Sequence, residues 1–498
     1  MQNDKEAAIN RVVIAGGGTA GWMTAAALSS LLGKNLDITL VESDAIPVVG
    51  VGEATIPPLL NFHKLLKVDE QDFMRATQAT FKLGINFENW REPGQEYFHS
   101  FGTTGKDCWA ATFHNFWLKA RQDGYSAPFE EYCLEIQAAK ANRFARDKNN
   151  TLNYAYHLDA SLYAGFLRKH AERHGVTRRE GMIARVEQCT DSGCIKALHL
   201  NDGGCIDGDL FIDCSGFRGL LIEQTLHAGY EDWSHWLPCD RAVAVQTRMA
   251  GALTPYTRSI AHDCGWRWRI PLQTRVGNGL VFCSRYLSDE QARQRLLESI
   301  DGDAITEPRI IPFRAGRRRK TWLKNCVAIG LSSGFIEPLE STSIHLIQRA
   351  VIRLMQLFPS RGIKQPDVEE FNRQSESETN YIRDFIVLHY KVTNRTDSPF
   401  WRYCRGMNIP ESLQRRIALF SECGRVFRED VDLFLENSWV QVMLGQGITP
   451  QQYHPIADLM SPEEQKTFLQ GIRESVSHVV EQLPAHEQFL KRYCAYKG

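Results

Sequence analysis

Short apolar runs that lead into glycine recur along the chain. The first, at residues 12–15, has the composition of a buried strand and enters a glycine-rich turn. The apolar spacing at 22–32 then predicts a helix that ends at Gly33, and residues 38–41 predict a second strand. Two later runs, 209–216 and 326–331, have the same form of a strand that ends in small residues. Strands alternating with helices in this way are typical of an α/β fold.

Residues 265–271 read GWRWRIP and alternate strictly between two kinds of side chain. In an extended segment Trp266, Trp268 and Ile270 share one face, Arg267 and Arg269 share the other, and Pro271 ends the run. The pattern predicts a half-buried strand with an aromatic face toward the core.

The remaining patterns suggest how the chain is organised. Residues 61–160 are expected to be largely helical, 235–285 to form strands, and the chain beyond about 400 to be helical. We therefore expect a core at residues 1–400 that carries a helical insertion at about 61–160. A helical C-terminal region, 401–498, is expected to pack on that core.

Composition excludes several classes of protein. The formal net charge of −1 over 498 residues argues against nucleic-acid binding, which needs a basic excess. The basic run at 317–320 is the exception, and we expect it to be a solvated loop or strand end. Thirteen cysteines without a CxxC pair suggest neither a metal site nor disulfides, and they fit a cytoplasmic protein. The polar N-terminus and the absence of a long apolar run predict neither a signal peptide nor a membrane span.

The glycine-rich turn matches the dinucleotide-binding pattern GxGxxG in its strand–turn–helix context. Gly16 permits a tight turn, Gly18 lets a pyrophosphate approach the backbone, and Gly21 allows close packing of helix on strand. The turn continues through Thr19 and Ala20 into the helix, whose N-terminal N–H groups favour phosphate. Glu42 ends the second strand, where a carboxylate binds a ribose diol.

We expect the nucleotide to be FAD rather than NAD. The chain holds a single GxGxxG fingerprint, and the two later strands return to it with Gly216 and with Gly330 and Leu331. Strands that return late to one dinucleotide are typical of folds in which FAD lies extended along the domain.

Four segments together resemble the flavin-dependent tryptophan halogenase family. They are GGGTAGWM at the first turn, GVGEATIPPL at 50–59 with Gly52 and Ala54, WRWRIP at 266–271, and GFIEPLEST at 334–342. The similarity runs from residue 11 to about 400 and more loosely to about 457. It implies an FAD-binding Rossmann-like fold of the flavin monooxygenase type, with mixed sheets and a helical C-terminal region on the substrate side.

The resemblance also implies a reaction. A separate NAD(P)H-dependent reductase supplies FADH2 by diffusion, and FADH2, O2 and chloride or bromide give hypohalous acid, which reaches an electron-rich aromatic substrate. In the family pattern Lys82 of "ATFKLGINF" would carry the halogen, and Glu340 of "EPLEST" would orient the lysine and accept the ring proton. Glu337 is the less favoured acid.

The halide site implied by the family lies just after Glu340. The backbone N–H groups of Thr342 and Ser343 would bind the halide. The family commonly has glycine at the position of Ser343, and we therefore predict that bromide is used at least as well as chloride.

The implied substrate wall is aromatic. It is formed by His99, Phe101, Ile85, Trp439 and Ser341. Members specific for tryptophan place a tyrosine pair before the equivalent tryptophan, whereas "ENSWVQ" around Trp439 has none. A site without the groups that pair a zwitterion leaves its charges uncompensated. We therefore predict that free tryptophan is a poor substrate and that an indole, a phenol or a larger molecule is preferred.

Two other functions stay open. A flavin-dependent aromatic hydroxylase of related fold would transfer oxygen directly to its substrate, and Lys82, WRWRIP and EPLEST argue against it. A prenyl-binding escort protein of the same fold would do no redox chemistry.

Trp266 and Trp268 have no useful acid or base, and we expect them to fill space between flavin and substrate. Whether the chain forms a homodimer stays open.

Overall fold

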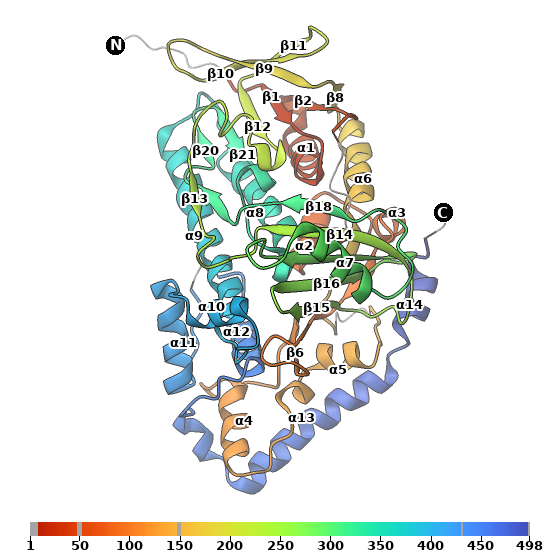
Figure 1. Cartoon of the computed structure of the whole chain (residues 1–498), viewed down its shortest axis with the longest axis vertical. Helices are drawn as coiled ribbons and strands as arrows, with labels where there is room; N and C mark the ends of the chain where they lie inside the picture. The colour runs from red at the N-terminus through yellow and green to blue at the C-terminus, as the bar shows by residue number, and fades with distance from the viewer. Residues whose placement is uncertain (1–7, 47–51, 147–150, 430–431, 497–498) are drawn as a thin grey trace.

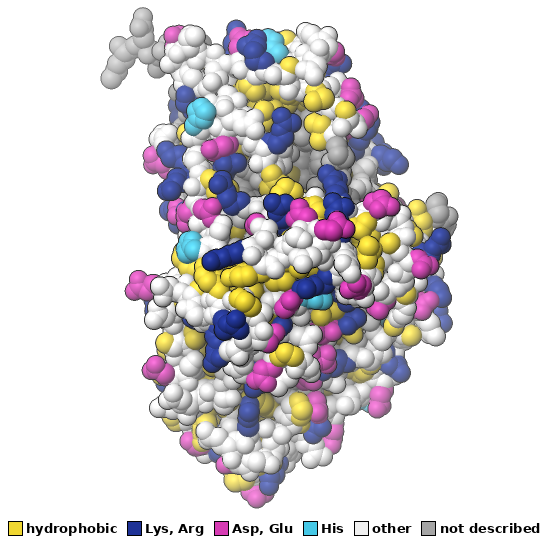
Figure 2. Space-filling view, in the orientation of Figure 1, with side chains coloured by type: hydrophobic (Ala, Val, Ile, Leu, Met, Phe, Trp, Pro, Cys, Tyr) yellow, Lys and Arg dark blue, Asp and Glu magenta, His cyan; other side chains and the backbone are white. Residues whose placement is uncertain are grey.

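The computed structural model describes residues 8–46, 52–146, 151–429 and 432–496. Figure 1 shows a mostly parallel sheet near one end, a larger mixed sheet in the middle, and helices of the C-terminal region at the other end. Basic and acidic side chains are mixed over the face in Figure 2, as the near-zero net charge leads one to expect.

The first sheet has six strands in the order β20-β21-β12-β1-β2-β8. These are β20 (Trp322–Leu323), β21 (Cys326–Ala328), β12 (Leu210–Asp213), β1 (Arg11–Ala15), β2 (Asp37–Glu42) and β8 (Thr177–Glu180). All neighbours are parallel except β20 and β21, so the carboxyl ends of five strands meet at one edge. The four predicted strands and the predicted α/β class are confirmed.

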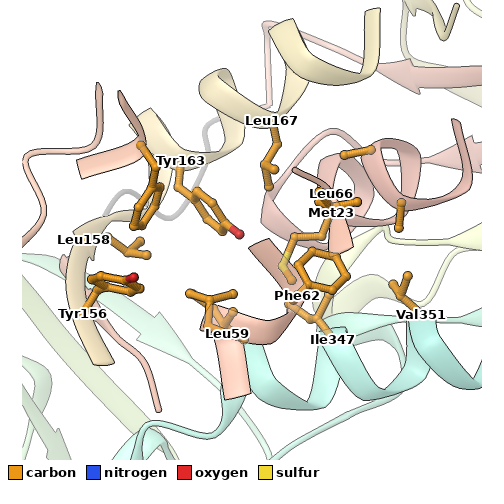
Figure 3. Close-up of a cluster of buried hydrophobic side chains, with 14 of the residues drawn as sticks. Met23, Leu59, Phe62, Leu66, Tyr156, Leu158, Tyr163, Leu167, Ile347 and Val351 are labelled. Atoms are coloured by element: carbon orange, nitrogen blue, oxygen red, sulfur yellow. The ribbon is translucent and has the colours of Figure 1, made fainter. Parts of the chain in front are cut away.

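Three helices cover this sheet and build the first core. They are α1 (Thr19–Leu32), α6 (Ala160–Arg173) and α8 (Ser343–Gln356). Figure 3 shows how side chains from α1, α2 (Pro58–Leu65), β7 (Ala155–Asp159), α6 and α8 meet in one cluster. Segments more than 300 residues apart therefore share one core, which fixes the position of α8.

The second sheet has seven strands in the order β18-β14-β17-β16-β15-β5-β6. These are β18 (Arg309–Pro312), β14 (Arg241–Arg248), β17 (Arg275–Phe282), β16 (Gly265–Pro271), β15 (Thr257–His262), β5 (Gly84–Glu88) and β6 (Glu96–Ser100). The GWRWRIP strand is β16, as predicted. The prediction that it is half-buried is wrong, because all seven residues are buried. On the other face Arg269 donates a hydrogen bond to the carbonyl oxygen of Ala250, and α7 (Asp289–Ser299) packs on the neighbouring strands β14 and β17.

Residues 61–160 are not largely helical, in contrast to the prediction. Helices α3 (Glu70–Ala76), α4 (Phe113–Gln122) and α5 (Leu134–Lys140) do occur there. Lys82, however, ends β4 (Thr80–Lys82), which pairs with β7 in the order β3-β7-β4, where β3 is Gly52–Ala54. Ile85 and His99 also lie on strands, β5 and β6, where they face each other as pairing partners. The short apolar runs here contribute strands to two sheets. Periodicity alone cannot distinguish a short buried strand from a segment of buried helix.

The basic run at 317–320 is only partly solvated, which corrects the prediction. Arg317 and Arg318 belong to β19 (Gly316–Arg318), between β13 (Tyr230–Asp232) and β22 (Gly334–Phe335), and both are buried. Arg317 forms ion pairs with Glu231 and Glu376. Acidic partners far away in the sequence make this burial possible.

The last part of the chain is helical, as predicted. It comprises α9 (Gln365–Lys391), α10 (Pro399–Gly406), α11 (Glu411–Cys423), α12 (Glu436–Gly445), α13 (Pro462–Gln482) and α14 (His486–Tyr493). Helices α9, α10 and α12 share a second hydrophobic cluster with the seven-stranded sheet.

A three-stranded sheet lies at the end of the molecule opposite the C-terminal helices (Figure 1). Its strands are β11 (Cys205–Asp207), β10 (Ile195–Leu200) and β9 (Ile183–Gln188). Among the residues that the structure describes, no helix combines the length and apolar character needed to cross a membrane.

Candidate functional site

A cavity of about 670 Å³ opens at the carboxyl edge of the six-stranded sheet and extends to the face of β16. Its lining contains most residues that the sequence assigns to the cofactor: Gly16, Gly18, Thr19, Ala20, Glu42, Gly52, Ala54, Gly216, Gly330 and Leu331. Gly50 and Val51 of the GVGEATIPPL segment lie outside the described residues. Gly21 is not part of the lining and packs beneath the turn.

The three glycines of the turn have different surroundings. A Cβ at Gly16, where φ is +114°, would lie 2.3 Å from the carbonyl oxygen of Cys214, and one at Gly21 would lie 1.9 Å from that of Gly16. A Cβ at Gly18 would meet no protein atom within 4 Å. The backbone is thus tightly packed at two glycines and faces open space at the third, beside the start of α1. This is the geometry that a pyrophosphate requires, and the residues fit FAD.

These surroundings predict that one alanine variant loses FAD affinity and that another loses stability. Gly18→Ala should leave the thermal midpoint within about 1 °C, but it should weaken FAD binding about ten-fold or more, because its methyl group occupies the space for the pyrophosphate. Gly21→Ala should instead lower the free energy of unfolding by about 1–3 kcal/mol, because its methyl group meets backbone. Thermal unfolding and FAD fluorescence titration measure the two effects. Equal FAD affinity in Gly18→Ala and the wild type would argue against this position for the phosphates.

Glu42 is held at the cavity by residues that sequence reasoning missed. Its carboxylate accepts hydrogen bonds from Trp22 Nε1 (3.3 Å) and from Arg178 Nε (2.5 Å), and Arg178 also pairs with Asp44. Arg178 lies on β8, the edge strand next to β2, and no local pattern distinguished it from other surface arginines.

The far wall of the cavity is formed by β16 and β3. Trp266, Trp268 and Ile270 line it, whereas Pro271 does not. Glu53, which no sequence pattern indicated, also lines it, and burial raises the pKa of its carboxyl to about 7. The predicted aromatic face of the GWRWRIP strand is therefore the face directed at the cavity.

Lys82 is not part of the cavity lining and is fully buried. Its Nζ donates hydrogen bonds to the carbonyl oxygen of Thr55 (3.0 Å) and to Ser341 Oγ (2.8 Å), and it lies 5.1 Å from the ring centre of Phe101. Burial lowers the pKa of Lys82 to about 7, and the charge of Glu340 partly opposes that shift. A buried amine with so low a pKa is partly neutral at physiological pH, as a nucleophilic or halogen-accepting lysine must be.

Glu340 is enclosed between two histidines. Its Oε2 lies 2.8 Å from His99 Nδ1, and its Oε1 lies 2.8 Å from His389 Nε2 in a contact that is close but poorly aligned. Tyr97 Oη lies 2.7 Å from the other ring nitrogen of His389. Burial alone would raise the pKa of Glu340, but His99 and His389 lower it to about 2, so that the carboxyl is ionised. His389 and Tyr97 were not expected from the sequence.

Of the residues predicted to hold the substrate, Ser341 lines the cavity, whereas His99, Phe101, Ile85 and Trp439 do not. Trp439 on α12 is buried, its Nε1 has no hydrogen-bond partner, and its ring meets that of Phe385 edge-on at 4.8 Å. The His99 ring lies 5.4 Å from Phe385, and Arg416 lies 4.2 Å above Trp439. Ile85 lies on β5 as the strand partner of His99. Phe385 and Arg416 are additions that only the fold brings together.

The turn at Ser341 connects the cofactor cavity with the surroundings of Lys82. Ser341 has φ +59°, a left-handed backbone conformation between the short helix η5 (Pro338–Glu340) and α8, and both Ser341 and Ser343 line the cavity. Thr342 is the N-cap residue, and its buried Oγ1 has no partner. Helix N-termini leave N–H groups without intrahelical partners, which suits an anion. The hydroxyl of Ser341 also accepts the hydrogen bond from Lys82, so Ser341 contacts both the lysine and the cavity.

Comparison with known proteins gives consistent matches along nearly the whole chain. The tryptophan halogenase family model matches residues 11–462. Tryptophan 7-halogenase RebH of Lentzea aerocolonigenes is 35% identical over 97% of this chain and 98% of its own length. Xcc4156, a flavin-dependent halogenase from Xanthomonas campestris, is 56% identical, with a TM-score of 0.97 over 99% of this chain and 100% of that one. BrvH, a flavin-dependent halogenase from Brevundimonas sp. BAL3, is 46% identical with a TM-score of 0.94 over 98% and 99% of the two chains.

Proposed function

The chain belongs to the tryptophan halogenase family of flavin-dependent halogenases. From this premise we propose how its residues divide the reaction between the cofactor cavity and the surroundings of Lys82. The resemblance seen in the four sequence segments is confirmed. The protein is an enzyme of the class that uses FADH2 from a separate flavin reductase, O2 and a halide.

The cavity side would hold the cofactor. When bound, FADH2 would supply two of the four electrons that reduce O2 and the halide would supply the other two, which gives hypohalous acid, water and FAD. Gly18 and the first N–H groups of α1 would bind the pyrophosphate, Glu42 would bind the ribose, and Trp266, Trp268 and Ile270 would lie beside the ring. The N–H groups of Thr342 and Ser343 would hold the halide at the start of α8.

The observation that carries the proposal is the buried Lys82 joined to Ser341. Nζ of Lys82 lies 2.8 Å from a hydroxyl whose residue lines the cavity, while its other surroundings are Thr55 and the ring of Phe101. Lys82 would receive the halogen at Nζ, either as hydrogen-bonded hypohalous acid or as a haloamine, and present it to the ring carbon of the substrate. Glu340, ionised between its histidines, would accept the proton that the ring loses.

The substrate would be an indole-like or phenolic ring held by His99, Phe101, Ile85, Trp439 and Ser341. Aromatic side chains hold such rings by contact area and offset stacking, without a need for charge pairing. No tyrosine pair precedes Trp439 to bind an amino acid backbone. Ser343, at the position where the family commonly has glycine, leads us to propose that bromide is accepted at least as well as chloride.

A competition experiment tests this assignment. The purified protein is supplied with a generic flavin reductase, FAD, NADH and equal concentrations of bromide and chloride, with indole or free tryptophan as substrate. We expect brominated indole to equal or exceed chlorinated indole. We expect tryptophan turnover to be lower than indole turnover by about ten-fold or more, the factor expected when one charged group is left unpaired. Halogen isotope patterns in the mass spectra identify the products.

The same assay shows how the proposal would fail. Mainly chlorinated product would contradict the bromide assignment, and rapid turnover of tryptophan would contradict the substrate assignment. Oxygenated products that persist in Lys82→Ala would support an aromatic hydroxylase. A protein that does not bind FAD would support the escort function.

A further inference from the structure

Glu337 is a second buried carboxylate, three residues before Glu340. It has no exposed surface, and its Oε2 accepts hydrogen bonds from Trp266 Nε1 (2.9 Å) and from Tyr390 Oη (2.5 Å). Its Oε1 has no hydrogen-bond partner, and none of the described cations forms an ion pair with it. The proposed reaction gives this group no role.

The buried position of Glu337 lowers the stability of the fold compared with an apolar residue at the same place. Burial raises the pKa of its carboxyl to about 7, although the bonds from Trp266 and Tyr390 act in the opposite direction. A buried acid without a cation is usually less stable than a well-packed apolar residue of the same volume. Packing alone therefore does not account for an acid here.

What Glu337 binds is a wall of the cofactor cavity. Trp266 lines the cavity, and its indole ring lies 6.1 Å from that of Trp268 and 6.3 Å from that of Trp90. The indole nitrogen is the single polar atom of this side chain, and it is bound to Glu337. A ring held at both its packed face and its polar atom has one orientation.

The same helix holds Glu337 and Glu340. His389 and Tyr390 are consecutive residues of α9, and they contact Glu340 and Glu337 respectively. Glu337 is the N-cap residue of the short 3-10 helix η5 (Pro338–Glu340), and Glu340 is its last residue. The orientation of the cavity wall and the position of the proposed proton acceptor are therefore set by one structural unit.

We propose that Glu337 is a positioning residue that fixes the indole of Trp266 as the partition between the cofactor cavity and Lys82, so that hypohalous acid passes to the lysine rather than to solvent. This inference rests on the proposed function. It adds that the efficiency with which reduced flavin is converted into halogenated product depends on the hydrogen bond between Glu337 and Trp266.

The test measures halogenated product formed per FADH2 in a single turnover, together with free hypohalous acid captured by an added trapping reagent. Glu337→Leu and Trp266→Phe each remove the hydrogen bond, and Trp266→Phe keeps an aromatic ring. We expect the product per FADH2 to fall about five-fold in both, the factor for one lost hydrogen bond, and the trapped acid to rise correspondingly. Glu337→Gln keeps an acceptor oxygen for Trp266 and should stay within about two-fold of the wild type.

Trp90→Phe is the matched control. It makes the same substitution in the same aromatic cluster, but it loses a hydrogen bond to the carbonyl oxygen of Ser259, and Trp90 does not line the cavity. We expect its product per FADH2 to equal that of the wild type. FAD affinity and thermal midpoint are measured for every variant, since a positioning role predicts a change in coupling without a change in cofactor binding.

The outcomes separate this inference from the proposed function. A wild type that gives no halogenated product overturns the proposed function. A wild type that halogenates, with Trp266→Phe coupling equally well, overturns this inference even if Glu337→Leu does not fold. An equal loss of coupling in Trp90→Phe would also overturn it, because the effect would then be one of packing.

Discussion

Replacing Lys82 with methionine should lower the halogenation rate by about 10³-fold or more while FAD binding is kept, since general acid–base and nucleophilic groups contribute factors of this size. Methionine fills a similar volume without an amine, and Lys82 is not part of the cavity lining that would hold FAD. Product formation with excess FADH2 and substrate measures the loss. Release of free hypohalous acid should continue, because the residues proposed for its generation are unchanged.

The same variant should be more stable than the wild type, and the gain should depend on pH. Burial lowers the pKa of Lys82 to about 7 in the folded protein, whereas an unfolded lysine has a pKa of about 10.4. Between these values the unfolded chain binds more protons, so the wild type becomes more stable as the pH rises from about 7 to 10. Lys82→Met removes this penalty, so its stabilisation should be largest below pH 7 and should vanish near pH 10.

Two outcomes would contradict this role for Lys82. Halogenation by Lys82→Met at more than a tenth of the wild-type rate would show that the amine does not handle the halogen. A stability difference that is the same at pH 6 and pH 10 would show that the amine is not buried in a neutral form. Lys82→Arg is the control for charge, because its guanidinium stays protonated and should be inactive at every pH.

Glu340→Gln should lower the halogenation rate by about 10²-fold, at the lower end of the range for a proton-transferring group. The amide keeps hydrogen-bonding atoms for His99 and His389 but cannot take up the ring proton. Loss of the negative charge also removes the interaction that raises the pKa of Lys82. If the neutral amine accepts the halogen, the residual rate should therefore begin to rise at a lower pH than in the wild type, where the rise is expected near pH 7.

Glu70→Gln provides the matched control for removing a largely buried acid. Glu70 accepts hydrogen bonds from Tyr154, Tyr156 and Tyr493, away from the cavity. We expect this variant to lose stability but to keep its rate and its pH profile. A Glu340→Gln variant with an unchanged rate would rule out Glu340 as the proton acceptor.

The nucleotide-binding part of the fold could be predicted because its signals are local. Residues 12–33 contain a strand, a glycine turn and a helix within a single stretch, and the two returning strands each end in small residues. The alternation in GWRWRIP likewise predicted a strand and its aromatic face. Such features depend on backbone geometry over a few residues, which the sequence encodes directly.

The surroundings of Lys82 and Glu340 could not be predicted in the same way. His389 and Tyr390 reach their carboxylates from α9, about 50 residues further along the chain, and Arg178 reaches Glu42 from 136 residues away. Burial of Arg317 on β19 depends on Glu376, which also belongs to α9. Each of these contacts is produced by tertiary packing, and none leaves a periodic pattern in its own segment.

The placement of α12 has a consequence for engineering. This helix packs on β6 and supplies Trp439, yet it contributes no described residue to the cofactor cavity. A chimera that takes its α12 from a relative should therefore exchange substrate scope as a cassette, with oxidant production unchanged. Libraries that diversify residues 436–445 would sample new acceptors at little risk to the flavin chemistry.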